Sequence, residues 1–195
     1  MAERINRWEN FGMKKGKELE YSLLKSIKNS PYFFQYKEEL DSLVQKYSEK
    51  KQRVPLEEAM GLVKKYQPAG WDAVNPPKQL LKDLKLEVGE LLHLSDADMD
   101  KVKTYTAVDS VLDSNFGVDA FLTLENKGKE YFVTYDLTRN PDKERGKHQN
   151  TILITDLAEP PEPGEKVSPE QENTYLASVE KIAKLTVDQL RSLEI

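Results

Sequence analysis

The stretch that decides the fold is VDAFLTLENKGKEYFVTYDLT, residues 118–138. It contains two runs, 118–125 and 130–138, in which apolar and polar residues alternate and β-formers dominate. A glycine-containing loop over 126–129 joins them, and this arrangement predicts a β-hairpin. With Lys127 and Gly128 at its tip, the hairpin has a register in which Asp119 faces Asp136.

That register places two acids side by side. Side chains alternate between the faces of a strand, so Asp119 shares a face with Phe121 and Asp136 shares one with Thr134. Directly opposed Cβ atoms lie about 5 Å apart, where like charges destabilise a sheet. Two carboxylates there share a proton or a cation, and Mg²⁺ binds carboxylate oxygens. The pair indicates a metal site; a shifted register or a wet sheet end are the alternatives.

Around the hairpin, the sequence predicts a β-rich core over 103–157 and a helical part over 13–101. The β-prone segments 103–112 and 151–157 add outer strands, giving a mixed sheet of about four strands. Helical spacing of apolar residues predicts helices over 13–28, 36–51, 55–66, 78–93 and 95–101. The fold class is therefore α/β (α+β), a central sheet flanked by helices in a single domain over 1–157.

The C-terminal part begins with a Pro/Glu-rich segment, 158–167, which we interpret as a linker. Ser168, Pro169 and Gln171 then form a helix-start signature, with a capping box and proline at the first helical position. Thr186 repeats this signature with its own glutamine three residues on. We expect two C-terminal helices over 168–195 that pack on the core.

Composition limits the function classes. A net charge of −5 argues against a uniformly basic nucleic-acid binder and leaves room for a local basic groove. The chain has no cysteine, so disulfides and thiolate metal sites are excluded. No apolar run approaches the roughly 20 residues of a membrane span, and the N-terminus has no signal-peptide core. We expect a cytoplasmic protein with no membrane partner.

A third acid is indicated in the first predicted helix. At about 100° per residue, Glu20 falls near the middle of the apolar stripe of that helix. The stripe consists of Leu19, Leu23, Leu24 and Ile27. A glutamate on an apolar face is costly unless it is paired or binds a metal, and Gly16 on the same side allows close approach of another element. Pairing with a lysine, or extension of Glu20 to solvent, is the alternative.

These residues resemble the PD-(D/E)XK nuclease superfamily: a helix with Gly16 and Glu20, then a hairpin bearing Asp119 and the run Asp136-Leu137-Thr138. The stretch DSVLDSNFGVDAF, residues 109–121, is similar to the second motif of that family, a turn glycine before the strand that bears the metal aspartate. The resemblance covers 13–28 and 103–157, less than half of the chain.

The resemblance implies a restriction-endonuclease-like αβββαβ core and hydrolysis of nucleic acid. It makes Asp119, Asp136 and Glu20 the ligands of Mg²⁺ (or Mn²⁺). The chain departs from the family by a helical insertion over about 30–95, which makes Glu87 a rival to Glu20. Glu87 lies off the leucine stripe of its own helix, so Glu20 is preferred.

A second departure is Thr138, which stands where the family has the lysine that orients the attacking water. Lys143 or Lys147 would supply this ammonium group from the following segment, and Arg139, Lys143, Arg145 and Lys147 would contact backbone phosphates. The other interpretation is a non-catalytic binding or assembly module with a nuclease-like fold, for which a homodimer is one arrangement. An α+β domain of unrelated role is the third.

Overall fold

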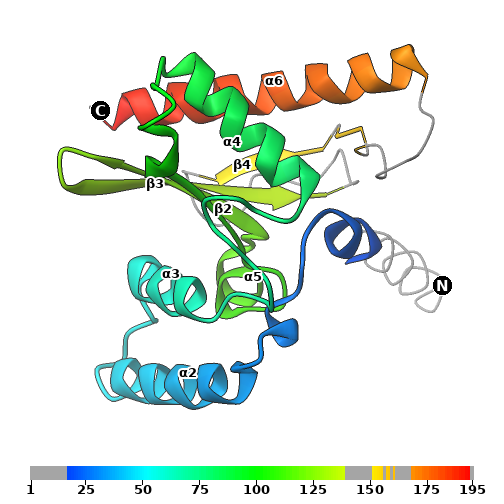
Figure 1. Cartoon of the computed structure of the whole chain (residues 1–195). Coiled ribbons are helices and arrows are strands. Elements are labelled where there is room, and N and C mark those ends of the chain that lie inside the picture. Colours follow the sequence, from blue (N-terminus) through cyan, green and yellow to red (C-terminus); the bar gives the residue numbers. More distant parts are fainter. Residues whose placement is uncertain (1–16, 139–150, 156, 159, 161–167, 194–195) are drawn as a thin grey trace, which may run out of the picture.

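The computed structural model describes residues 17–138, 151–155, 157–158, 160 and 168–193. Their centre is a four-stranded mixed sheet in the order β1-β2-β3-β4, flanked by helices on both faces (Figure 1). The strands are β1 (Val102–Thr106), β2 (Ala120–Asn126), β3 (Lys129–Leu137) and β4 (Thr151–Ile154). The first three pair antiparallel, and β4 runs parallel to β3. The predicted fold class, a mixed sheet between helices, is confirmed.

The central hairpin has the predicted register. Phe121 pairs with Thr134, and Thr123 pairs with Phe132. At the tip, Lys127 (φ 52°) and Gly128 (φ 74°) are both left-handed, the conformation that a two-residue type I′ turn requires. The ladder ends at the pair Ala120–Tyr135, so the two predicted aspartates lie just beyond its last pair.

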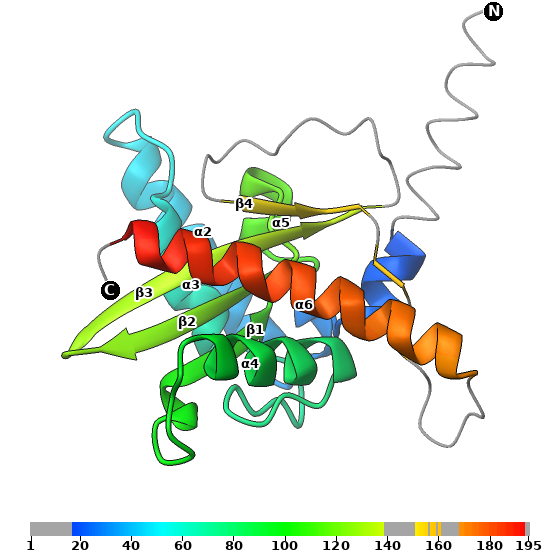
Figure 2. The same cartoon turned by 90° about the horizontal axis from the view of Figure 1, so that it is seen from above.

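One face of the sheet is covered by α4 (Gln79–Leu91) and α6 (Pro169–Ser192), as Figure 2 shows. Their apolar sides share one core with the sheet, which includes Leu80, Leu84, Val88, Leu122, Val133, Tyr135, Ile182 and Leu190. Because α6 contributes to this core, the C-terminal helix belongs to the domain. In the described part, no helix has the length and apolarity that a membrane crossing requires.

The C-terminal region differs from the prediction in one respect: α6 is a single continuous helix. Its start is as predicted, with a complete capping box at Ser168 and Gln171. Thr186 starts no second helix; its hydroxyl donates to the Ile182 carbonyl (2.9 Å) and lies 3.0 Å from the Tyr135 hydroxyl. A threonine that bonds one turn back and is buried against a strand is compatible with a helix interior.

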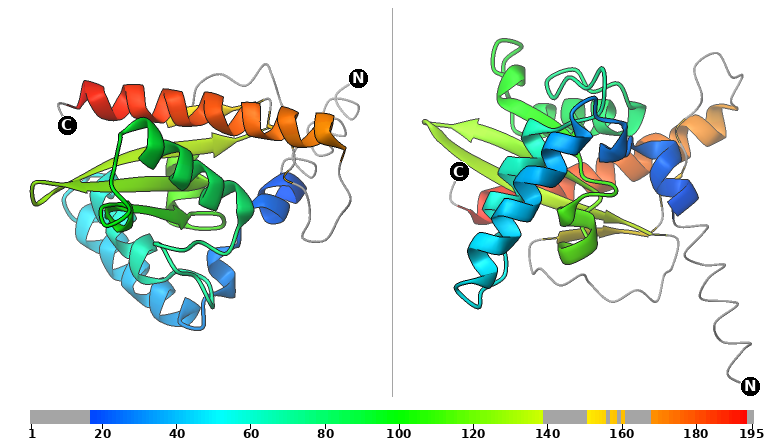
Figure 3. Two further views of the ribbon diagram at one scale, coloured as in Figure 1. Left: turned by 45° about the horizontal axis from the view of Figure 1, so that its top comes forward. Right: turned by 90° about the horizontal axis from the view of Figure 1, so that it is seen from below.

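The opposite face of the sheet is covered by α3 (Leu56–Lys65) and α5 (Val111–Phe116). The helix α2 (Phe33–Ser48) packs on α3 and lies farther from the sheet (Figures 1 and 3). A second core joins these helices to the sheet and includes Ile27, Tyr36, Met60, Val63, Leu112 and Phe121. The sheet is thus the middle layer between two separate apolar cores.

Three elements, besides small shifts at the ends of others, differ from the sequence-based expectation. The strand predicted over 103–112 ends at Thr106, because Ser110 caps a short helix: its Oγ accepts from the Leu112 N–H at 3.0 Å. The first helix is described over 17–23 and is followed by the 3₁₀ turn η1 (Ile27–Asn29). The helix predicted over 95–101 is only the 3₁₀ turn η2 (Met99–Lys101).

Candidate metal centre

Three carboxylates from separate elements meet beside the hairpin. One oxygen each of Glu20, Asp113 and Asp119 lies within 4.8 Å of the other two. Glu20 comes from the first helix, Asp113 from α5 and Asp119 from the residue before β2. The structure therefore brings together Glu20 and Asp119, two of the three predicted ligands, and adds Asp113. We call these three residues the acidic group.

The turn between α5 and β2 positions two of the three. Gly117 ends α5 in the left-handed region (φ 66°), and the Val118 N–H donates to the Leu112 carbonyl at 3.1 Å. This tight reversal brings Asp119 back beside the helix that carries Asp113. A Cβ at Gly117 would lie 3.8 Å from Oδ2 of Asp136, an ordinary van der Waals contact, so glycine is needed here for the left-handed backbone conformation.

Asp136 lies next to the acidic group. Its side chain is 1% exposed, and its Oδ2 is close to Gly117, on the α5 side of the sheet. It is not a member of the 4.8 Å set, in part because the hairpin changes its pairing at this end: the Asp119 N–H donates to the Tyr135 carbonyl (2.8 Å), one residue before Asp136. A fourth carboxylate therefore adjoins the acidic group.

Asp119 is the most buried member of the acidic group, with 4% of its surface exposed. Burial raises the pKa of Asp119 to about 8, and the negative charge of Glu20 contributes in the same direction. The Leu137 N–H, which donates to Oδ2 at 2.7 Å, opposes this rise. Within the described residues, no lysine or arginine is within ion-pair distance of Asp119. Its ionised form therefore lacks a direct counter-ion from this part of the chain.

Lys17 is the cation nearest to the other members. Its Nζ lies 3.2 Å from Asp113 and 3.6 Å from Glu20, and 3.5 Å from Asp109. Partial burial lowers the pKa of Lys17, but the three carboxylates, Asp113 foremost, outweigh this and raise it above its usual value. Lys17 is therefore charged, and it is shared between the acidic group and Asp109.

Asp109 has a structural role at the edge of the acidic group. It accepts from Ser26 Oγ (2.6 Å), Tyr21 Oη (2.9 Å) and Lys28 Nζ (3.1 Å). Burial would raise the pKa of Asp109, but these hydrogen bonds lower it below its usual value. Its own N–H donates to Asp113 at 2.9 Å, which orients that carboxylate. Asp109 thus ties the first helix and η1 to the start of α5.

The remaining predicted residues lie elsewhere. Glu87 is on α4, across the sheet, where its charged neighbours are Glu90, Glu180 and Lys184. Thr138 is buried just after β3. The predicted phosphate contacts and lysine substitutes, Arg139, Lys143, Arg145 and Lys147, lie outside the residues that the structure describes.

Sequence reasoning missed Asp113 and Lys17 as site residues. Both left a signal: Asp113 lies inside the stretch 109–121 that carries the resemblance, and Lys17 precedes Glu20 by three residues, which puts the two on one helical face. The helix α5 was not expected, so nothing in the strand pattern predicted that Asp113 would point toward Asp119.

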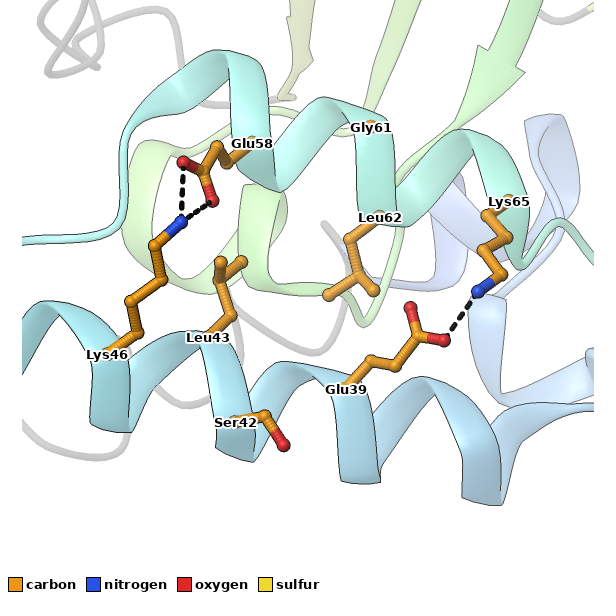
Figure 4. Close-up of a pocket in the computed structure, with 8 residues that line it drawn as sticks. All are labelled: Glu39, Ser42, Leu43, Lys46, Glu58, Gly61, Leu62 and Lys65. Carbon is orange, nitrogen blue, oxygen red and sulfur yellow. Dashed lines mark hydrogen bonds and ion pairs between the residues drawn. The ribbon is translucent and has the colours of Figure 1, made fainter.

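A different hollow lies between α2 and α3 (Figure 4), and no residue of the acidic group lines it. Leu43 and Leu62 project into it, and two ion pairs connect the helices along its sides. These pairs are Lys46 with Glu58 and Lys65 with Glu39. Because each lysine there has its own carboxylate, this hollow offers no uncompensated charge to a metal or a phosphate.

Comparison with known proteins does not assign the chain. No protein-family model matches it. No curated protein matches it, and no solved structure does.

Proposed function

We propose that the chain is a nuclease of PD-(D/E)XK type that hydrolyses phosphodiester bonds in nucleic acid with Mg²⁺ or Mn²⁺. Asp119, Glu20 and Asp136 would be the metal ligands, with Asp113 as a further ligand. The observation that carries the proposal is a buried Asp119 within 4.8 Å of two more carboxylates. Carboxylates this close repel one another unless protons or a cation intervene, and oxygen-only donor sets suit Mg²⁺ and Mn²⁺.

The residues themselves suggest how the site would work. A bound divalent ion would polarise the phosphoryl oxygens and lower the pKa of a water molecule. Asp119, whose pKa of about 8 keeps it largely protonated without metal, would give up its proton as the ion binds. Lys17 would hold a positive charge close to the attacked phosphate and would orient the attacking water, which is the task of the family's lysine that Thr138 replaces. Lys143 and Lys147 are the alternative donors of that charge.

A specific observation favours a second candidate, the non-catalytic binding or assembly module. Lys17 already compensates Asp113 and Glu20 in part, at 3.2 and 3.6 Å. An ammonium in the place of a metal would make the acidic group an internal ion-pair network that attaches the first helix to α5. Thr138 in place of the lysine agrees with this candidate as well.

Cleavage assays test the first candidate. We expect the wild-type protein to cleave DNA or RNA with Mg²⁺ or Mn²⁺, and Asp119→Ala and Asp136→Ala each to lower the rate by at least about 100-fold, because each removes a ligand of the ion. Glu125→Ala is the matched control: it removes an exposed acid from the opposite end of β2. Circular dichroism of each variant would verify folding.

Thermal unfolding with Mn²⁺ separates the two candidates. Binding to the native state raises Tm, so the wild type should gain Tm with Mn²⁺ and Asp119→Ala should lose that gain. A Mn²⁺-dependent Tm without cleavage of any single- or double-stranded DNA or RNA would favour the non-catalytic module. If neither cleavage nor a Tm change occurs, the metal centre itself is refuted.

A further inference from the structure

A second hollow adjoins the acidic group, and three lysines line it. It lies between the first helix with η1 on one side and the start of α4 on the other. Lys25, Lys28 and Lys78 face it, and Asp109 forms one edge. We call it the lysine pocket. Its volume of about 410 Å³ leaves room for a phosphate group with its water.

Two of these lysines have no counter-ion in the described part of the chain. The Nζ of Lys25 donates to the Ala69 carbonyl (3.2 Å), and the Nζ of Lys78 donates to the Ser22 carbonyl (2.7 Å). These carbonyls hold the side chains in place without neutralising them. Burial lowers the pKa of Lys78, and the nearby charge of Lys25 lowers it further. Like charges in one hollow without a carboxylate partner are stabilised by an anion.

The contrast with other lysines makes this arrangement specific. Lys28 is compensated by Asp109 at 3.1 Å. In the hollow between α2 and α3, Lys46 and Lys65 each have a glutamate partner. Lys25 and Lys78 come from elements far apart in sequence and still converge on one pocket. Ordinary solvated lysines on one exposed helix face would not show this convergence.

The lysine pocket and the acidic group are neighbours. Asp109, at the pocket edge, and Asp113, in the acidic group, both contact the same Lys17 ammonium, at 3.5 and 3.2 Å. The side chain of Lys17 therefore lies between the edge of the lysine pocket and the acidic group. A nucleic-acid strand carries a phosphate at every nucleotide. A strand with its scissile phosphate at the acidic group would bring a flanking phosphate to this pocket.

We propose that the lysine pocket binds a backbone phosphate that flanks the scissile phosphate of a nucleic-acid substrate, with Lys25 and Lys78 as its contacts. The inference rests on the proposed nuclease function for the identity of the ligand. The pocket would hold the strand on one path across the acidic group, because it would bind the flanking phosphate on the side of Asp109.

Binding without cleavage is the direct test. Fluorescence anisotropy with a labelled single-stranded DNA, its duplex and the matching RNA would be measured in EDTA, so that no metal supports hydrolysis. We expect Lys25→Gln/Lys78→Gln to weaken binding about tenfold or more at low salt. The slope of log K against log salt should fall by about one for each phosphate that the variant no longer neutralises. Lys129→Gln is the control, since it makes the same kind of charge change at the exposed hairpin tip.

Each outcome decides the proposal. Unchanged affinity and salt slope in the double variant would overturn it, and so would an equal loss in Lys129→Gln, which would indicate general charge attraction. Absence of wild-type binding to all three nucleic acids would overturn it too. If inorganic phosphate raises Tm through these lysines while no nucleic acid binds, the pocket takes small anions and the proposal fails.

A parallel measurement keeps this inference distinct from the nuclease proposal. The Mn²⁺-dependent rise in Tm should persist in Lys25→Gln/Lys78→Gln, because neither lysine belongs to the acidic group. A wild type with lysine-dependent binding of nucleic acid but no response to Mn²⁺ would retain the phosphate pocket and refute the metal centre. The reverse pattern, a Mn²⁺ response with lysine-independent binding, would refute the pocket alone.

Discussion

The two faces of the central sheet have opposite characters, although neighbouring residues of the same strands form them. On the α4/α6 face, Leu122 and Val133 are completely buried in apolar surroundings. On the α5 face, Phe121 packs in the second apolar core. Farther along this face, at the open end of the hairpin, the buried residues are Asp119 and Asp136. Leu122 and Phe121 are adjacent in β2 and belong to different cores, because side chains alternate between the faces of a strand. Asp136 likewise points away from the core that its neighbours Tyr135 and Leu137 enter.

The α4/α6 face stabilises the fold, whereas the α5 face holds the carboxylates of the candidate site. Burying apolar area is favourable whichever residue does it, so the α4/α6 face can supply stability without chemistry. Burying carboxylates is unfavourable and is retained only where protons, hydrogen bonds or cations compensate. The α5 face therefore carries a cost that the apolar cores on both faces offset, and the two faces should respond differently to substitution.

The largest expected effect on stability is on the apolar face. Leu122→Ala leaves a cavity between β2 and the helices α4 and α6 and should lower the free energy of unfolding by about 3–4 kcal/mol. Urea denaturation would measure it. The Mn²⁺-dependent change in Tm should be preserved, because the acidic group lies on the opposite face. Loss of the Mn²⁺ response in a variant that still unfolds cooperatively would show that the two faces are not separable.

The next effect on stability is that of Asp119→Asn, and it depends on pH. The pKa of Asp119 is about 8 in the folded protein, against an ordinary value of 3.8. Between these values the folded state holds a proton that the unfolded state releases, so metal-free stability falls as pH rises from about 4 to about 8. Asp119→Asn cannot ionise and keeps an oxygen for the Leu137 N–H. At pH 8 it should be more stable than wild type, and the difference should be smaller at pH 5, where less of this linkage acts on wild type.

Urea denaturation in EDTA at pH 5 and pH 8 would measure this effect. The difference between wild type and Asp119→Asn isolates Asp119, because the other carboxylates are common to both proteins. Parallel pH profiles would contradict the buried, protonated state of Asp119. Mn²⁺ should narrow the gap at pH 8, since the ion compensates the carboxylate in wild type and finds a poorer ligand in the variant.

The sequence predicted the parts of the molecule that short-range rules control. Alternation and a glycine turn were enough for the hairpin register, which is why Phe121 and Thr134 were paired correctly. Helical spacing predicted α2, α3 and α4 with shifts of a few residues at their ends. The start of α6 was predicted because a capping box is a local signal.

The parts of the fold and of the site that the sequence did not predict depend on tertiary contacts. The run 103–112 is β-prone in composition, but Ser110 and Gly117 bound a short helix that begins inside it, and that helix brings Asp113 to Asp119. Thr186 has the sequence of a helix start, yet burial against Tyr135 keeps it in a helix interior. For the candidate site, Glu20 was predicted by its position on an apolar stripe, whereas Lys17 required knowledge of which carboxylates surround it.

The smallest expected effect on stability, and the most informative for mechanism, is that of Lys17→Met. The Lys17 side chain is 44% exposed, so its ion pairs are screened by solvent and should contribute less than about 1 kcal/mol. Methionine keeps the length of the side chain and removes the charge. The acidic group then loses its nearest described cation, so Mn²⁺ should bind more tightly while cleavage falls, because no ammonium faces the phosphate. Lys17→Arg keeps the charge and should restore a part of the activity.

Titration of the Mn²⁺-dependent Tm beside cleavage rates would measure both effects. Equal losses of metal binding and cleavage in Lys17→Met would instead mean that the ion pairs hold the acidic group in shape, and Lys17 would then belong to the framework of the site.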